Sequence, residues 1–106
     1  MKSATKKTFS WTGFVRQYGE QNKGRPTRLG IFEAGNDYWI EDGLPLTGID
    51  FDTGSGVTTQ IMLGEGMTHT IPDTRSVRIS FSATEMNDGL DITGGDGKTT
   101  VLRFED

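Results

Sequence analysis

The residues Gly43-Leu44-Pro45-Leu46-Thr47-Gly48-Ile49-Asp50-Phe51-Asp52 carry the clearest structural signal in the chain. The two leucines occupy even positions, whereas Ile49 and Phe51 occupy odd ones. Because side chains alternate between the two faces of a strand, this change of parity near Gly48 predicts a β-bulge or a sharp bend. A strand that bends in mid-course is typical of a small sheet that curls toward a barrel.

A helix is predicted upstream of this strand. Four large apolar side chains follow the i, i+3, i+4, i+7 spacing of one helical face: Trp11, Phe14, Val15 and Tyr18. We expect the helix to run from about Trp11 to Asn22 and to stop at Gly24. Gly13 and Gly19 each weaken it by about 1 kcal/mol relative to alanine. The helix therefore depends on docking its aromatic stripe onto a sheet.

The rest of the chain reads as short strands separated by turns. Residues 57–63 and 77–81 alternate apolar with polar positions, and turns are expected at 34–37, 41–43, 87–89 and 94–97. The last three strands are expected to form an up-down meander. We predict a single α+β domain over residues 1–106, with residues 1–8 as a flexible lead. Its N-terminal helix packs on a strongly twisted antiparallel sheet, or incomplete small barrel, of about six strands.

Composition excludes several classes of function. The absence of cysteine rules out disulfides, thiolate nucleophiles and Cys-ligated zinc, and it fits a reducing cytoplasm. The single histidine, His69, rules out a His-rich metal site. A net charge of −4 argues against nonspecific nucleic-acid binding. No apolar run is long enough to span a bilayer, and no secretory signal is expected. We predict a cytoplasmic protein without a cofactor.

The segment Leu44-Pro45-Leu46-Thr47-Gly48-Ile49-Asp50-Phe51-Asp52 resembles the core of a small bacterial family of uncharacterised single-domain proteins, catalogued as a domain of unknown function. Its pattern is a Trp-containing helix, Leu-Pro-Leu-x-Gly-Ile-x-aromatic-Asp, an alternating strand, His-x-Ile with a nearby Pro, and a late Asp-Gly turn. Here Trp11, His69-Thr70-Ile71-Pro72 and Asp96-Gly97 match the other elements. The resemblance implies a bacterial origin and brings no catalytic residues.

Tyr38 and Trp39 are the leading candidates for a protein-binding surface. They are adjacent in an expected strand, so they face opposite sides and one of them is expected to lie outside the core. Tryptophan and tyrosine are also enriched at the energetic centres of protein interfaces.

Two other candidate sites invite a chemical role. Asp50 and Asp52 are weak candidates for a metal site, because the stretch starts like a calcium loop. The loop pattern then fails at Gly54 and Ile61, which favours an exposed strand face. His69 is the one imidazole that could act as a general base; an edge-strand or loop histidine is the alternative.

We therefore predict a protein without enzymatic activity that works by association with another protein, most simply with itself as a homodimer. The alternative is a module that binds a small molecule or metal. A hydrolase using His69 with a remote carboxylate and an RNA-binding domain resembling Sm-like folds are further hypotheses. Membrane association is not expected, and the acidic composition makes nucleic acid an unfavourable partner.

Overall fold

The computed structural model describes residues 11–54, 56–84 and 86–105, except for the side chains of Trp11 and Thr12. The predicted lead over residues 1–8 and the predicted docking of Trp11 lie outside the described parts. The elements are α1 (Trp11–Gln21), β1 (Pro26–Glu33), β2 (Asn36–Asp52), β3 (Thr58–Leu63), β4 (Met67–Ile71), β5 (Thr74–Phe81), β6 (Asn87–Gly94) and β7 (Thr99–Phe104). The fold is α+β, as predicted.

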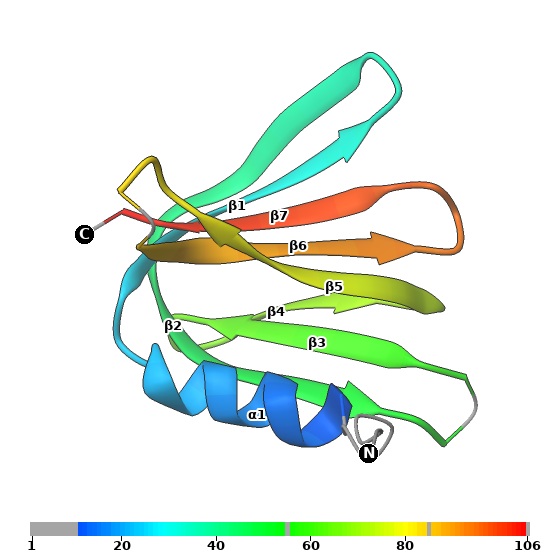
Figure 1. The fold of residues 1–106 in the computed structure, drawn as a ribbon, viewed down its shortest axis with the longest axis horizontal. Helices are drawn as coiled ribbons and strands as arrows, with labels where there is room; N and C mark the ends of the chain where they lie inside the picture. Colours follow the sequence, from blue (N-terminus) through cyan, green and yellow to red (C-terminus); the bar gives the residue numbers. More distant parts are fainter. Residues whose placement is uncertain (1–10, 55, 85, 106) are drawn as a thin grey trace.

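The strands form one antiparallel sheet in the order β4-β3-β2-β1-β7-β6-β5 (Figure 1). It has seven strands where about six were expected. The sheet is not closed, because β4 and β5 stand at its two ends. The predicted meander of the last three strands is confirmed by the adjacent pairs β5–β6 and β6–β7.

The long strand β2 joins the two halves of the sheet. Its first part pairs with β1, and its second part pairs with β3. The predicted irregularity is confirmed, since the β2–β3 register shifts between Leu46 and Gly48. The predicted turn at 41–43 is wrong. Gly43 has φ +95° and is the extra residue of a β-bulge. The residues on either side of it, Asp42 and Leu44, both pair with β1.

The turn predicted at 87–89 is also wrong, because β6 already begins at Asn87. Gly89 has φ +152°. A Cβ on Gly89 would collide with the carbonyl oxygen of Leu102, on the neighbouring strand β7. Glycine is thus required there by a close approach of two backbones within the sheet.

Helix α1 covers one side of the core and lies along β2 (Figure 1). It ends one residue before the predicted limit, and Gly24 follows with φ +91°. The predicted docking is confirmed for the described side chains: Val15 and Tyr18 are buried and Phe14 packs against the core. The sheet contributes the fully buried residues Leu29, Leu46, Ile61, Leu63, Leu90, Ile92 and Leu102. Within the described residues, no helix is long and apolar enough to cross a membrane.

Candidate functional site

The β1–β2 hairpin carries the two aromatic residues predicted to form a binding surface. It extends beyond the rest of the sheet (Figure 1). Tyr38 and Trp39 remain 44% and 42% exposed. In the β1–β2 ladder Tyr38 is opposite the buried Ile31, and Trp39 is opposite Gly30. The two side chains therefore lie on opposite faces of the hairpin. The sequence predicted that one of them would lie outside the core, and both are substantially exposed.

The Trp39 ring is held in place on the outer face by three residues of β1. Gly30 leaves room for it, because a Cβ there would lie 2.6 Å from a ring carbon of Trp39. Phe32 meets the ring edge-on, with centroids 5.5 Å apart. The guanidinium of Arg28 sits 4.2 Å from the centroid of the Trp39 ring, in a cation–π contact. Trp39 is thus fixed without being buried.

A groove of about 630 Å³ lies beside Trp39 on the same face of the sheet. Arg103 and Asp91 form an ion pair across it, with nitrogen and oxygen 2.8 Å apart. The Nε of Arg28 and the Oδ1 of Asp88 are buried and have no hydrogen-bond partner in the part of the chain that the structure describes. The groove therefore presents both signs of charge next to an aromatic ring.

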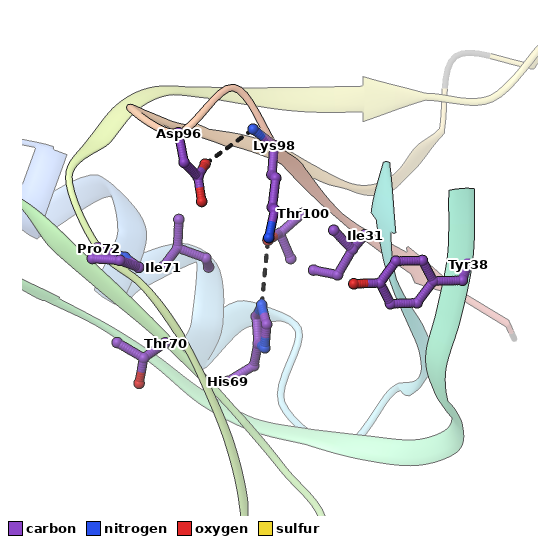
Figure 2. Close-up of a pocket in the computed structure, with 9 residues that line it drawn as sticks. All are labelled: Ile31, Tyr38, His69, Thr70, Ile71, Pro72, Asp96, Lys98 and Thr100. Carbon is purple, nitrogen blue, oxygen red and sulfur yellow. Dashed lines mark hydrogen bonds between the residues drawn. The ribbon is translucent and has the colours of Figure 1, made fainter. Parts of the chain in front are cut away.

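Tyr38 borders a second, smaller cavity of about 190 Å³, between β4 and the inner face of the hairpin (Figure 2). His69, Thr100, Lys98 and Asp96 line it as well. Tyr38, His69 and Thr100 come from strands far apart in sequence, whereas Asp96 and Lys98 belong to the turn between β6 and β7. The cavity offers an imidazole, two hydroxyls, an ammonium and a carboxylate to a small molecule.

His69 lies on edge strand β4, where its Nε2 is 3.3 Å from the Oγ1 of Thr100 on β7. Burial lowers the pKa of His69, so the imidazole is neutral at pH 7. Asp96 lines the same cavity, but its Oδ1 accepts the backbone N–H of Lys98 at 3.0 Å. The structure shows a His–Thr contact and no His–carboxylate pair among the described residues, so the geometry of a hydrolytic triad is not present there.

Asp50 and Asp52 both bond to donors of the protein. The Oδ1 of Asp50 accepts the Nε–H of Arg16 and the backbone N–H of Phe51, each at 2.9 Å. Both hydrogen bonds lower the pKa of Asp50, and the bond from Arg16 has the larger effect. Asp52 accepts the backbone N–H of Gly54 at 2.9 Å. No cluster of three or more potential metal ligands occurs in the described ranges.

Sequence reasoning did not predict that Arg28 and Phe32 contact the ring of Trp39. The signal is present in the sequence as Arg28-x-Gly30-x-Phe32, because alternate residues of a strand share one face. Only the register of β1 against β2 shows that Trp39 lies over that glycine.

Comparison of the chain with family models, with curated proteins and with solved structures gives no match. The resemblance to the bacterial Leu-Pro-Leu family accordingly stays a prediction.

Proposed function

We propose that this protein works by association with another protein through the β1–β2 hairpin, most simply with a second copy of itself, and that it has no catalytic activity. One observation carries the proposal. Two adjacent aromatic residues, Tyr38 and Trp39, stay more than two-fifths exposed on a hairpin that projects from the sheet. Exposed aromatics that flank polar groups are typical of interfaces.

The immobilisation of Trp39 supports this function. A ring already held between Arg28 and Phe32 loses little conformational entropy when a partner covers it. Tryptophan and arginine are also the residue types most enriched among energetically dominant contacts. The charged residues of the adjacent groove supply the polar rim that surrounds such anchors.

Light scattering on the eluting peak of a size-exclusion column tests the proposal. The wild type should show a mass above that of one chain that rises with concentration, and the double variant Tyr38→Ala/Trp39→Ala should elute as a single chain. The matched control is Phe81→Ala, which removes an aromatic that is 61% exposed on β5. It should leave the mass unchanged. A wild type that stays a single chain at millimolar concentration would rule out self-association.

Binding of a small molecule is a second candidate function, because the cavity beside Tyr38 brings together donors and an acceptor. A thermal-shift screen of small metabolites tests it. A ligand of this cavity should raise the unfolding temperature of the wild type and lose its effect in Thr100→Val, where the hydroxyl facing His69 is gone. A screen without any stabilising compound counts against this function.

Two further proposals concern where the protein belongs. We place it in the cytoplasm, where a domain without cysteines needs no oxidising compartment. We also propose membership of the Leu-Pro-Leu family, for which the bend that follows Leu46 in β2 is the supporting feature.

A further inference from the structure

The two end strands of the sheet differ in how well they are protected against pairing with another chain. Natural proteins block free edges with charged side chains, prolines and bulges. Strand β5 carries Arg75 and Arg78, and its register with β6 shifts twice. Strand β4 contains no charged residue and no proline, and its five pairs with β3 follow without a shift. By these features β4 is the less protected of the two edges.

The sequence of β4 is complementary to itself. Met67-Thr68-His69-Thr70-Ile71 has the same pattern in both directions about His69. In an antiparallel pair centred on His69, Thr68 faces Thr70 of the second copy and Met67 faces Ile71 of the second copy. Threonine pairs and apolar pairs are both favourable cross-strand neighbours. No like charges meet, in contrast to the arginines that a second β5 would bring to β5.

The central position tolerates the pairing as well. His69 would face His69 of the second copy, and burial lowers the pKa of this imidazole, so the pair carries no charge at pH 7. The groups around it in the monomer are the hydroxyls of Thr100 and Tyr38, the ammonium of Lys98 and the carboxylate of Asp96. Their two opposite charges balance.

We infer that a second copy of this chain binds by pairing its β4 antiparallel to β4, about a two-fold axis at His69, so that one sheet runs through both copies. The inference deepens the proposed function and rests on its self-association form. Tyr38 lines the same cavity as β4, so the added strand lies next to its exposed ring.

Charge pairs at the open edge test this arrangement. Thr68 and Thr70 are exposed, so Thr68→Lys/Thr70→Lys and Thr68→Glu/Thr70→Glu should fold like the wild type. In the two-fold pair each variant sets like charges opposite one another, which should raise the dimer dissociation constant by about tenfold or more. Mixing the two variants should restore the dimer, because opposite charges then meet. The control Ser76→Lys/Ser80→Lys on β5 should leave the dimer unchanged.

The register is tested with single cysteines, since the chain has none. A mixture of Thr68→Cys and Thr70→Cys should form a disulfide-linked dimer on mild oxidation, whereas Thr68→Cys alone should link far more slowly.

The outcomes separate the inference from the proposed function. A wild type that associates while both charge variants stay dimeric overturns the β4 pairing and leaves self-association standing. Folded, monomeric variants that fail to associate when mixed overturn it too. A wild type that is monomeric at every concentration overturns both self-association and the pairing.

Discussion

Gly19 of α1 lies against the backbone of Ile49 in β2, so closely that a Cβ on Gly19 would come within 2.9 Å of the Ile49 amide nitrogen. Both residues are buried. Glycine, which weakens an isolated helix, here allows the helix to approach the strand just beyond the bend. The contact fixes how α1 sits on the second half of β2.

Replacing Gly19 by alanine should therefore destabilise the protein. The overpacking should cost about 1–3 kcal/mol, which exceeds the gain of about 1 kcal/mol in helix propensity. Urea unfolding measures the change. The control Glu20→Ala, at an exposed neighbouring position, should stay within about 0.5 kcal/mol of the wild type. A Gly19→Ala protein at least as stable as the wild type would contradict the close approach.

Tyr18→Phe should lower stability by about 1–3 kcal/mol. The Tyr18 hydroxyl donates to the Oδ1 of Asn87 at 2.5 Å and links α1 to β6. Without it, a partly buried amide oxygen loses its donor; the amide nitrogen of Asn87 still donates to Asn22. Tyr38→Phe is the matched control, because that side chain is exposed and should change stability by less than about 0.5 kcal/mol. Equal unfolding curves for the two variants would show that the hydrogen bond from Tyr18 to Asn87 does not contribute to stability.

Gly30→Ala should displace the Trp39 ring, whose carbon atoms occupy the space of the new methyl group. Measured in a Trp11→Phe background, which leaves Trp39 as the single tryptophan, the emission should shift to the red and become easier to quench. Association through the hairpin should weaken in parallel. In the control Gly48→Ala, the new methyl group would meet only the flexible end of Met62 at 3.3 Å, and emission should not change. An unshifted spectrum for Gly30→Ala would mean that Trp39 is not fixed over Gly30.

His69 should make stability depend on pH. Burial lowers its pKa in the folded state below the value of about 6.5 expected in the unfolded chain. The unfolded state therefore binds the proton more readily, and the contribution of His69 is complete above about pH 6.5 and lost as the pH falls through the folded pKa. Denaturant unfolding of the wild type and of His69→Gln between pH 8 and pH 5 measures it.

The difference in stability between these two proteins should be constant above pH 7 and should shrink toward acid pH. Taking the difference removes the contributions of titrating groups that do not interact with His69. A difference that is the same at pH 5 and pH 7 would show that His69 is not desolvated.

Calcium should give no binding heat in isothermal titration up to millimolar concentration, because Arg16 and the N–H of Gly54 already engage the carboxylates of Asp50 and Asp52. Arg16→Ala should remain calcium-free and should lose no more than about 1 kcal/mol, since its ion pair is exposed. Heat from the wild type that disappears in Asp50→Asn would instead establish a metal site.

Elements with a clear local period could be predicted. The stripe of Phe14, Val15 and Tyr18 and the parity change that follows Leu46 are both features of neighbouring residues, and the structure has them where the sequence predicts them. Turns were less predictable. Gly43 and Gly89 follow acidic residues, a turn-like pattern, yet both lie inside strands, because pairing with adjacent strands continues past them.

The sequence by itself determined the class of fold, the exposure of at least one hairpin aromatic and the chemistry that the chain lacks, since all three follow from residue type and short-range alternation. Only the tertiary structure decided that Gly30 supports Trp39, that His69 meets Thr100, and that β4 rather than an inner strand is left at an edge. These relationships join residues brought together by strand order and register. Both depend on how apolar faces throughout the chain are buried together, and no short segment encodes that.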